Sequence, residues 1–374
     1  MCGHSLQLFM GGRNMHLIRK TLTGLTMIAF IAFSISACSP ASSQKSVSVS
    51  PGDLDMEQGI QITGNQVTIG LALGTLAEER WVNERKYFET EAAKYDAKVL
   101  TQDANMDETL QYWQVSDFIK KRIDVLVLVA VNENTAVTCV NAAKKAGIPV
   151  LAYSRMIKNA DIDAFIGFDA VAIGESLAKA AVEKVPQGNY MIINGAPIDN
   201  NATSQRKGYY NILQPSIDKG MINIVYEEWC DNWSPQKAKE AAEDGLQKNN
   251  SKVDAIIVSN DGMAGGVVQT LTNWKLDGRI FVSGTDGDLS AIQRIAAGMQ
   301  TVTLLYPQKE FAEEGARAAI SLANELLPAD ATGKTDNGFK QVPTIFAKTV
   351  LVTRDNLEET IIKPGILKKG DIYK

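Results

Sequence analysis

The stretch Val67–Trp81, V-T-I-G-L-A-L-G-T-L-A-E-E-R-W, decides the fold of this chain. Its first half alternates large apolar residues with small ones, which is typical of a buried strand, and its charged second half predicts a helix. Gly74 and Thr75 supply the turn between the two. In an open parallel sheet, ligands collect beyond the carboxyl ends of the strands. Arg80 and Trp81 follow such an end, and together they suit a small ring that carries both O–H and C–H groups.

Strands and helices alternate along the rest of the chain. The strongest strand is predicted over 125–130, where Val and Leu dominate, and a helix over 135–146 leads from it to a strand over 148–152. A second series of helices and strands begins near residue 171 and ends with a strand over 349–352. Such alternation is typical of parallel sheets covered by helices. We therefore expect an α/β protein whose strands divide between two sheets.

The N-terminus carries the pattern of a secretion signal. Basic residues at 19–20 precede an apolar run over 22–35, which is too short for a comfortable membrane span. The motif I-S-A-C, which ends at Cys38, resembles the lipobox of bacterial lipoproteins, in which the cysteine is acylated. We expect residues 1–38 to be a lipoprotein signal peptide, with an ordinary signal peptide as the alternative. Residues 39–66 are rich in Ser, Gly and Gln and predict a flexible tether.

The composition excludes several classes of function. A net charge of −5 and the lack of a long basic run argue against nucleic-acid binding. His4 and His16 are the only histidines, and both precede the expected cut at Cys38. The mature chain would therefore have no Ser-His-Asp or Cys-His centre and no zinc site of the His type. Cys139 and Cys230 lack metal-type spacing, so we expect them to be buried or free thiols, and we expect neither a metal nor a cofactor.

Polar and aromatic side chains follow one predicted strand after another. They are Arg80 and Trp81, Ser154 and Arg155, Asp199 to Asn201, Asp231 to Trp233, Asn260 and Asp261, and Asp286 to Asp288. Asp and Asn can bridge vicinal hydroxyls, Arg donates in a fork, and Trp covers the C–H face of a pyranose. Hydrogen bonds to charged groups contribute roughly 1.5–3 kcal/mol each, so three or four with one stacked ring give micromolar binding, about −8 kcal/mol. This pattern predicts a sugar site.

Structural alternatives exist for these residues taken singly. An Asp or Asn after a strand is also a helix N-cap, and for Asn260 and Asp288 alone that interpretation is about as good as binding. A single Trp such as Trp81 or Trp233 is more typical of a core. For Arg155, which follows a buried strand, a purely structural role is less expected than a binding role. The repetition at successive strand ends is what favours a binding site.

Several motifs together resemble one family. They are E-E-R-W (78–81), L-A-Y-S-R-M-I (151–157), A-D-I-D (160–163), V-P-Q-G-N-Y (185–190), P-I-D-N-N-A (197–202), V-S-N-D (258–261), G-T-D-G-D-L (284–289) and R-I-A-A-G-M-Q-T (294–301). Over nearly all of 67–374 the chain resembles the bacterial periplasmic D-xylose-binding proteins, which are type I, ribose-binding-like substrate-binding proteins of ABC importers. The resemblance implies two Rossmann-like lobes with parallel sheets, joined by a three-strand hinge, with the sugar in the cleft. It implies a first lobe of 67–167 plus 302–343 and a second of 168–301 plus 344–374.

The resemblance also implies a set of ligand-binding residues. Carried over position by position, they are Arg80, Arg155, Asn201, Asn260 and Asp286 with Asp199, while Trp81 and Trp233 sandwich the ring. This chain departs from the family pattern at Ser154, where relatives usually have Asp, and at Tyr306, where they usually have Lys. An acidic acceptor and a basic donor are thus both missing at the expected site. We expect weaker binding of xylose or a different preferred sugar.

These observations predict a lipid-anchored, extracytoplasmic binding protein that closes on a monosaccharide, D-xylose or a similar aldose, and delivers it to the permease subunits of an ABC importer. No catalytic residue is expected. One alternative keeps the fold and makes the chain the sugar-sensing subunit of a chemoreceptor or histidine kinase. A glycosidase with Asp199 and Asp286 as paired carboxylates is disfavoured, because no general acid in a buried, apolar setting is evident. A repressor of this fold would need a DNA-reading helix pair where the signal and tether lie.

Overall fold

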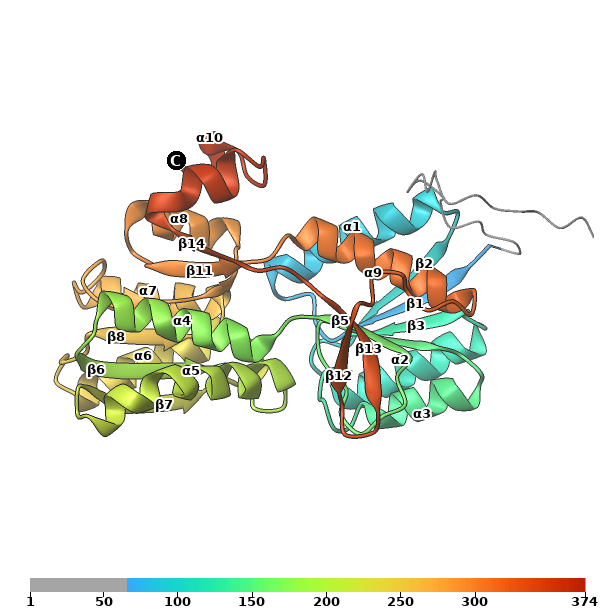
Figure 1. Ribbon diagram of the computed structural model, residues 1–374, viewed down its shortest axis with the longest axis horizontal. Helices are drawn as coiled ribbons and strands as arrows, with labels where there is room; N and C mark the ends of the chain where they lie inside the picture. The colour runs from blue at the N-terminus through green and yellow to red at the C-terminus, as the bar shows by residue number, and fades with distance from the viewer. Residues whose placement is uncertain (1–65, 374) are drawn as a thin grey trace, which may run out of the picture. The chain divides into compact units, whose positions relative to one another are not determined.

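The computed structural model describes residues 66–373. The expected signal peptide with Cys38, and the expected tether apart from Gln66, lie outside these residues. Two lobes built from parallel sheets and helices make up the described chain (Figure 1). The expectation of an α/β fold with two such lobes is therefore confirmed.

A seven-stranded sheet forms the centre of the first lobe, in the order β12-β13-β5-β4-β3-β1-β2. Every neighbouring pair is parallel except β12 with β13. The strands are β1 (Thr68–Leu73), β2 (Lys98–Asp103), β3 (Val125–Leu128), β4 (Val150–Tyr153), β5 (Ala164–Gly167), β12 (Gly333–Asp336) and β13 (Gln341–Phe346). The helices of this lobe are α1 (Glu79–Lys94), α2 (Glu108–Lys120), α3 (Val137–Lys145) and α9 (Gln308–Ala323).

The alternation in β1 distributes its side chains between two apolar clusters, one on each face of this sheet. Leu71 and its odd-numbered neighbours belong to the cluster that contains Phe88 of α1 and Phe311 of α9. Ala72 belongs to the cluster that contains Phe118 of α2. Gly70 lies on this second face, where an added Cβ would come within 2.6 Å of Ile123 Cδ1. The period-two pattern thus places α1, which carries the first candidate site residues, against the sheet.

Two sheets form the second lobe. Four parallel strands run in the order β7-β6-β8-β9, and a smaller sheet has the order β10-β11-β14. The strands are β6 (Gly188–Asn194), β7 (Ile222–Trp229), β8 (Ala255–Val258), β9 (Phe281–Val282), β10 (Thr285–Asp286), β11 (Val302–Leu305) and β14 (Val350–Thr353). The helices are α4 (Ala170–Lys184), α5 (Asn200–Asp218), α6 (Pro235–Lys248), α7 (Asp261–Asn273), α8 (Leu289–Ala297) and α10 (Lys369–Ile372), with single turns η1 (Asp231–Trp233), η2 (Arg354–Asn356) and η3 (Glu358–Ile362).

The chain passes between the lobes three times, as expected for a three-strand hinge. The crossings lead from β5 to α4, from β11 to α9 and from β13 to β14. Strand pairing differs from the expected lobe boundaries in two places. Val302–Leu305 pairs with β10 and β14 of the second lobe, and β13 of the first lobe extends to Phe346. A short apolar strand does not reveal from its own sequence which sheet it joins.

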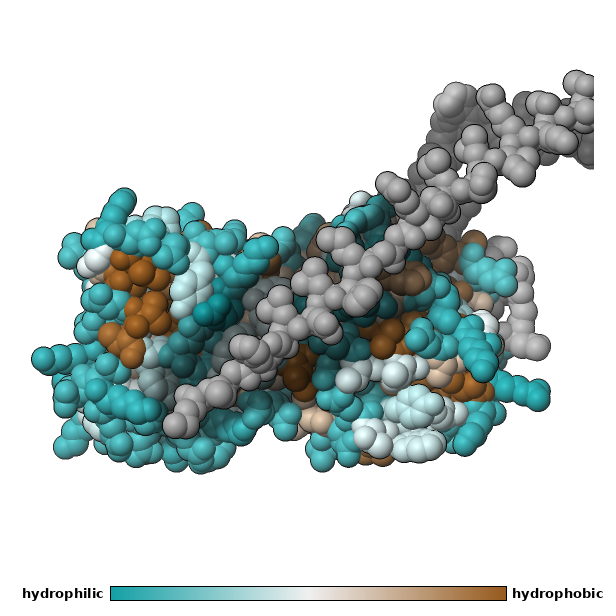
Figure 2. Space-filling view, turned by 90° about the horizontal axis from the view of Figure 1, so that it is seen from below, coloured by the Kyte–Doolittle hydropathy of each residue, from teal (hydrophilic) through white to brown (hydrophobic). Residues whose placement is uncertain are grey.

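The surface of the described chain carries a few exposed apolar side chains. One face is largely hydrophilic and is interrupted by separate hydrophobic patches (Figure 2). Trp113 and Leu327 are among the most exposed large apolar residues, at 62% and 65%. Each of the two lies next to a second exposed apolar residue, Tyr112 and Leu326 respectively. Between residues 66 and 373, no helix combines the length and apolarity that crossing a membrane requires.

Candidate ligand-binding site

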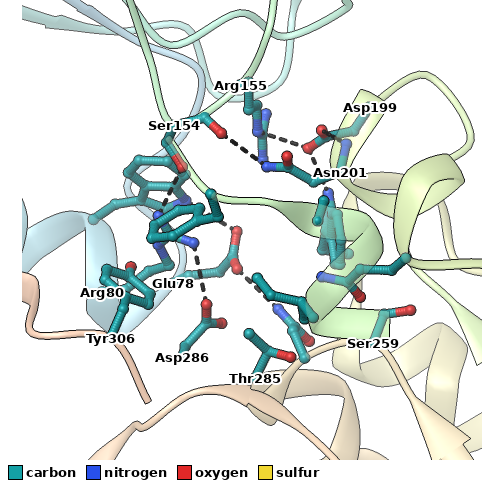
Figure 3. Close-up of a pocket in the computed structure, with 17 residues that line it drawn as sticks. Glu78, Arg80, Ser154, Arg155, Asp199, Asn201, Ser259, Thr285, Asp286 and Tyr306 are labelled. Carbon is teal, nitrogen blue, oxygen red and sulfur yellow. Dashed lines mark hydrogen bonds and ion pairs between the residues drawn. The ribbon is translucent and has the colours of Figure 1, made fainter. Parts of the chain in front are cut away.

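One cavity between the lobes is lined by every residue that the sequence singled out as a sugar ligand (Figure 3). These residues are Arg80, Trp81, Ser154, Arg155, Asp199, Asn201, Trp233, Asn260, Asp286 and Tyr306. The first lobe, the second lobe and the hinge all contribute to this set. Because parallel strands share one orientation, the loops that follow them converge on a single edge of each sheet. The two edges face each other across the cavity.

The first lobe supplies Arg80 and Trp81 from the start of α1, and Ser154 and Arg155 from the loop after β4. Ser154 has a φ of 63°, a value that residues other than glycine rarely adopt. Its backbone N–H donates to Ile166 O at 2.7 Å, which holds the turn against β5. Nη1 of Arg155 donates to Ala130 O at 3.1 Å, just beyond β3. The backbone thus presents both side chains at the end of the sheet.

The second lobe supplies Asp199 and Asn260, which serve two purposes at once. Each caps a helix: Asp199 accepts from the backbone N–H of Asn201 at 2.9 Å, and Asn260 accepts from that of Met263 at 2.9 Å. Their remaining polar atoms lie in the cavity wall. Asp199 Oδ2 accepts from the indole N–H of Trp233 at 3.1 Å, which fixes that ring. The capping and the binding interpretations of these residues are therefore compatible.

Polar contacts join the two lobes across the cavity. Nη1 of Arg80 lies 3.1 Å from Asp286 Oδ1, and Nε of Arg155 lies 2.7 Å from Asp199 Oδ2. The amide of Asn260 donates to Glu78 Oε2 at 3.0 Å, and the amide of Asn201 donates to Ser154 O at 2.9 Å. In this arrangement the donors of one lobe satisfy acceptors of the other. A ligand in the cavity must offer hydroxyls that take over such bonds, because buried polar groups left without partners are costly.

Arg80 makes hydrogen bonds and cation–π contacts with several neighbours. Its Nε donates to Glu84 Oε1 at 3.1 Å and its Nη2 donates to Ser154 Oγ at 2.9 Å. The guanidinium carbon lies 4.1 Å from the ring centroid of Trp81 and 4.9 Å from that of Tyr306, which are cation–π distances. Glu84 is only 2% exposed, so this ion pair is buried. Arg80 is therefore fixed by residues of its own lobe, by Tyr306 at the hinge and by Asp286 of the second lobe.

Tyr306 turns its hydroxyl away from the cavity. The hydroxyl donates to Glu84 Oε1, and the hydroxyl of Tyr153 donates to Glu84 Oε2 at 2.7 Å. The ring of Tyr306 packs against that of Phe168, with 4.4 Å between the centroids. At the two positions that depart from the family pattern, Ser154 and Tyr306, the side chains thus serve Arg80 and Glu84. The sequence missed Glu84, although its spacing of four residues from Arg80 places the two on one helix face.

The carboxylates of the cavity differ in the cations and hydrogen-bond donors that stabilise their charged forms. Burial raises the pKa of Asp286 well above its usual value, and the nearby Arg80 opposes this. Burial also raises the pKa of Glu78, against the attraction of Arg155 and Arg80. Glu78 accepts hydrogen bonds from two neutral donors, Trp81 and Asn260, and has no ion-pair partner among residues 66–373. The protonation state of Glu78 therefore depends on the contents of the cavity more than that of the other pocket carboxylates does.

The sequence missed seven other lining residues: Glu78, Phe168, Ala170, Ile173, Gln205, Ser259 and Thr285. Glu78 and Ser259 lie inside motifs quoted above, close to residues that were singled out, and Gln205 lies one helical turn after Asn201. These three could have been found from spacing. Phe168 and Ile173 lie where the chain leaves β5 and begins α4, and no strand-end pattern marks a hinge segment as part of a site.

The two cysteines of the described chain lie in buried surroundings. Cys139 and Cys230 are buried and free, as expected. Burial raises the pKa of Cys139 to about 11 and that of Cys230 to about 12, so neither thiol is activated. In the part of the chain that the structure describes, no cluster of three or more His, Cys, Asp or Glu residues is arranged to hold a metal ion.

Comparison with known proteins agrees with this geometry. A family profile described as a periplasmic binding protein domain matches residues 69–326. The chain is 42% identical to the D-xylose-binding periplasmic protein of Escherichia coli (strain K12), over 82% of this chain and 93% of that protein. It is 41% identical to the protein of the same name from Haemophilus influenzae, over 82% and 92%. A carbohydrate transporter solute binding protein from Chloroflexus aurantiacus, solved in complex with D-glucose, superposes with a TM-score of 0.76 at 26% identity, over 82% of this chain and 98% of that one.

Proposed function

Because the chain belongs to the periplasmic binding protein family, and to its sugar-binding members, we propose that it is the substrate-binding protein of an ABC importer for D-xylose or a similar aldose. Membership of a family of binding proteins agrees with the expectation that the chain is not an enzyme. The observation that carries the proposal is the convergence of forked polar groups and indole rings from both lobes on one cavity.

The proposed mechanism is closure of the lobes on the sugar. Arg80, Trp81 and Arg155 belong to the first lobe, while Asp199 and Trp233 belong to the second, so an open form offers only half of the contacts. A ligand shifts a conformational equilibrium by its difference in affinity for the two states. The closed form gains the second half of the contacts and is therefore the form that the sugar stabilises. A permease that recognises this form would accept only a loaded protein.

The identity of the sugar depends on Ser154 and Tyr306. Neither side chain presents a charged group to the cavity. The Ser154 hydroxyl oxygen accepts from Arg80, and the Tyr306 hydroxyl donates to Glu84. A sugar bound here therefore meets the Tyr306 and Phe168 rings where the family pattern has a basic donor. We propose a preference for aldoses that present C–H groups to these rings.

Anchoring by lipid at Cys38 and delivery to a permease are parts of the same proposal. A Cys38→Ser variant should leave the membrane fraction and appear free outside the cytoplasm. Retention of this variant in the membrane fraction would contradict the proposed anchor without affecting sugar binding.

Titration calorimetry with a panel of pentoses and hexoses tests the binding function. We expect heat from at least one aldose, with a dissociation constant on the order of micromolar or lower. A panel without any heat would contradict the proposal. Aryl glycosides, incubated with the protein as a control, should remain intact.

A further inference from the structure

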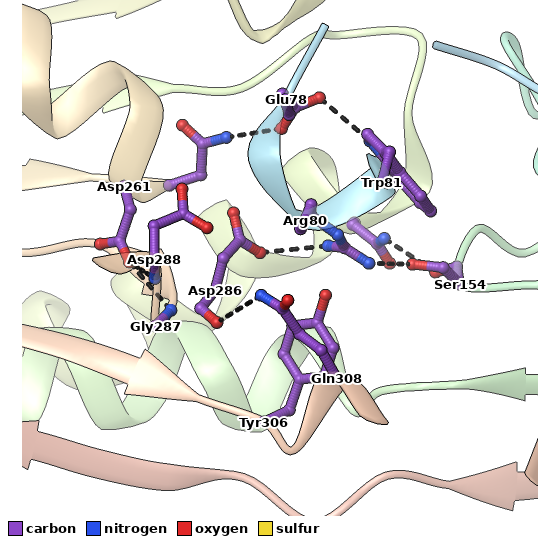
Figure 4. Close-up of polar contacts among 12 residues, drawn as sticks. Glu78, Arg80, Trp81, Ser154, Asp261, Asp286, Gly287, Asp288, Tyr306 and Gln308 are labelled. Carbon is purple, nitrogen blue, oxygen red and sulfur yellow. Dashed lines mark hydrogen bonds and ion pairs between the residues drawn. The ribbon is translucent and has the colours of Figure 1, made fainter. Parts of the chain in front are cut away.

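A group of carboxylates gathers beside the ligand cavity where the two lobes face each other (Figure 4). Glu78 and Glu79 come from the start of α1 in the first lobe. Asp286 and Asp288 follow β9, and Asp261 begins α7, all in the second lobe. Asp288 and Glu79 line one cavity of about 270 Å³, which also borders the hinge. Carboxylates of both lobes thus share a small space.

Asp288 is the least satisfied member of this group. It occupies the N-cap position of α8, but its side chain makes no capping hydrogen bond. The residue is 8% exposed, and its Oδ1 is buried without a hydrogen-bond partner among the described residues. Its backbone N–H donates to Asp261 Oδ2 at 3.1 Å, which draws two carboxylates together. A buried carboxylate oxygen without a donor favours the protonated form.

The cationic side chains near Asp288 form their ion pairs and hydrogen bonds with other groups. Arg80 pairs with Asp286 and Glu84, and Nη2 of Arg294 donates to the backbone oxygen of Asp261 at 2.7 Å. Lys309 lies 3.8 Å from Glu313. The charged groups that face Asp288 are Glu78, Glu79 and Arg80 on α1, Asp261 on α7, Asp286 on β10, Arg294 on α8, and Lys309 and Glu310 on α9. Negative charge therefore dominates around Asp288.

We propose that Asp288 is a proton-binding site which the two lobes complete when they close, so that sugar binding takes up a proton. This inference rests on the function proposed above, because it identifies the closed form with the loaded protein. Separation of the lobes moves Glu78 and Glu79 away from Asp288 and admits water to it. Closure reverses both changes and makes the charged form of Asp288 unfavourable.

The direction of the pH dependence follows from this difference. In the closed form, burial first and then Asp261 and Glu79 raise the pKa of Asp288 to about 8. A fully exposed aspartate has a pKa of about 3.9, which is the lower bound for the open form, where Asp261 of the same lobe stays beside Asp288. Between these values the closed form binds more protons than the open form, so closure is favoured as pH falls and weakened as pH rises toward about 8. Above that value neither form is protonated, and the affinity no longer changes for this reason.

Calorimetry measures the proton directly. D-xylose is titrated into the full chain at pH 7 in buffers of different ionisation enthalpy, and the slope of the observed enthalpy gives the number of protons taken up. The two pKa values above set an upper limit of about 0.9 proton for the uptake by Asp288, because Asp261 also lies beside it in the open form. The affinity should fall by up to about tenfold per pH unit between pH 5 and pH 7.

Asp288→Asn isolates the group, because asparagine keeps the shape and mimics the uncharged acid. The variant should take up fewer protons than the parent chain, by up to about 0.9, and bind sugar with a flatter pH profile. Asp355→Asn, at an exposed carboxylate of the same lobe, should match the parent chain.

The outcomes of these experiments distinguish failure of the inference from failure of the proposed function. Equal proton uptake by the parent chain and Asp288→Asn overturns the inference alone, as does a parent chain that binds without taking up protons. If neither D-xylose nor any other aldose produces heat, the proposed function fails and the inference fails with it.

Discussion

The two arginines of the cavity stand in different surroundings. Arg80 contacts Glu84 and Ser154 of its own lobe and two aromatic rings, and it also pairs with Asp286 of the opposite lobe. Arg155 has a charged partner in Asp199 of the opposite lobe, and within its own lobe it contacts one backbone oxygen and, at 5.5 Å, the ring of Trp81. The first arginine therefore has a buried charged partner in its own lobe as well as one across the cavity, whereas the charged partner of the second lies across the cavity. Stability and binding should respond differently when each is removed.

Removal of Arg80 should produce the largest effect. Arg80→Ala leaves Glu84 and Asp286 buried without their cation, and breaking a buried pair in this way costs about 3–5 kcal/mol. We expect the free energy of unfolding, measured with urea, to fall by that amount and sugar binding to be lost. A variant that unfolds like the parent chain would show that the Arg80 network carries little stability.

Removal of Arg155 should affect binding more than folding. Arg155→Ala loses a charged donor to the sugar, which we expect to weaken binding by roughly 1.5–3 kcal/mol, or more than tenfold. Asp199 keeps its bonds from Asn201 and Trp233, so the loss of stability should be smaller than for Arg80→Ala. Calorimetry and urea unfolding measure the two effects, and Arg279→Ala at an exposed site serves as the control. Normal binding by Arg155→Ala would mean that the ligand lies elsewhere.

Loss of the Tyr306 hydroxyl should have the smallest effect on binding. Tyr306→Phe removes one of the two hydrogen bonds that Glu84 Oε1 accepts, the other coming from Arg80, and a hydrogen bond to a charged group contributes about 1.5–3 kcal/mol of stability. The affinity for sugar should stay within a factor of about three, because the hydroxyl points away from the cavity. Tyr153→Phe removes the other donor to Glu84 and should behave alike. A large loss of affinity in Tyr306→Phe alone would show that its hydroxyl reaches the sugar.

The comparison also explains which parts of the site could be predicted from sequence. Arg155 and Asn260 follow apolar strands, and the ends of parallel strands converge whatever their order in the sheet, so local patterns were sufficient. Glu84 escaped notice because its role depends on Tyr306, a residue that lies 222 positions away. A contact of this kind forms only where the hinge brings distant segments of the chain together, so no local sequence pattern indicates it.

The fold shows the same division between local and distant information. Strands β1 and β3 are buried and apolar, and their patterns predicted them well. The hairpin of β12 and β13 was missed, because β12 is a polar edge strand and β13 contains Pro343. Sheet membership of Val302–Leu305 could not be predicted either, since pairing partners are chosen by the tertiary structure.

A crystal structure of the chain with D-xylose, or with whichever aldose gives the most heat, tests the central claim most directly. We predict one sugar ring between Trp81 and Trp233, with hydrogen bonds to Arg155 of the first lobe and to Asn260 or Asp286 of the second. A sugar that contacts only one lobe, or that lies outside this cavity, would contradict the account.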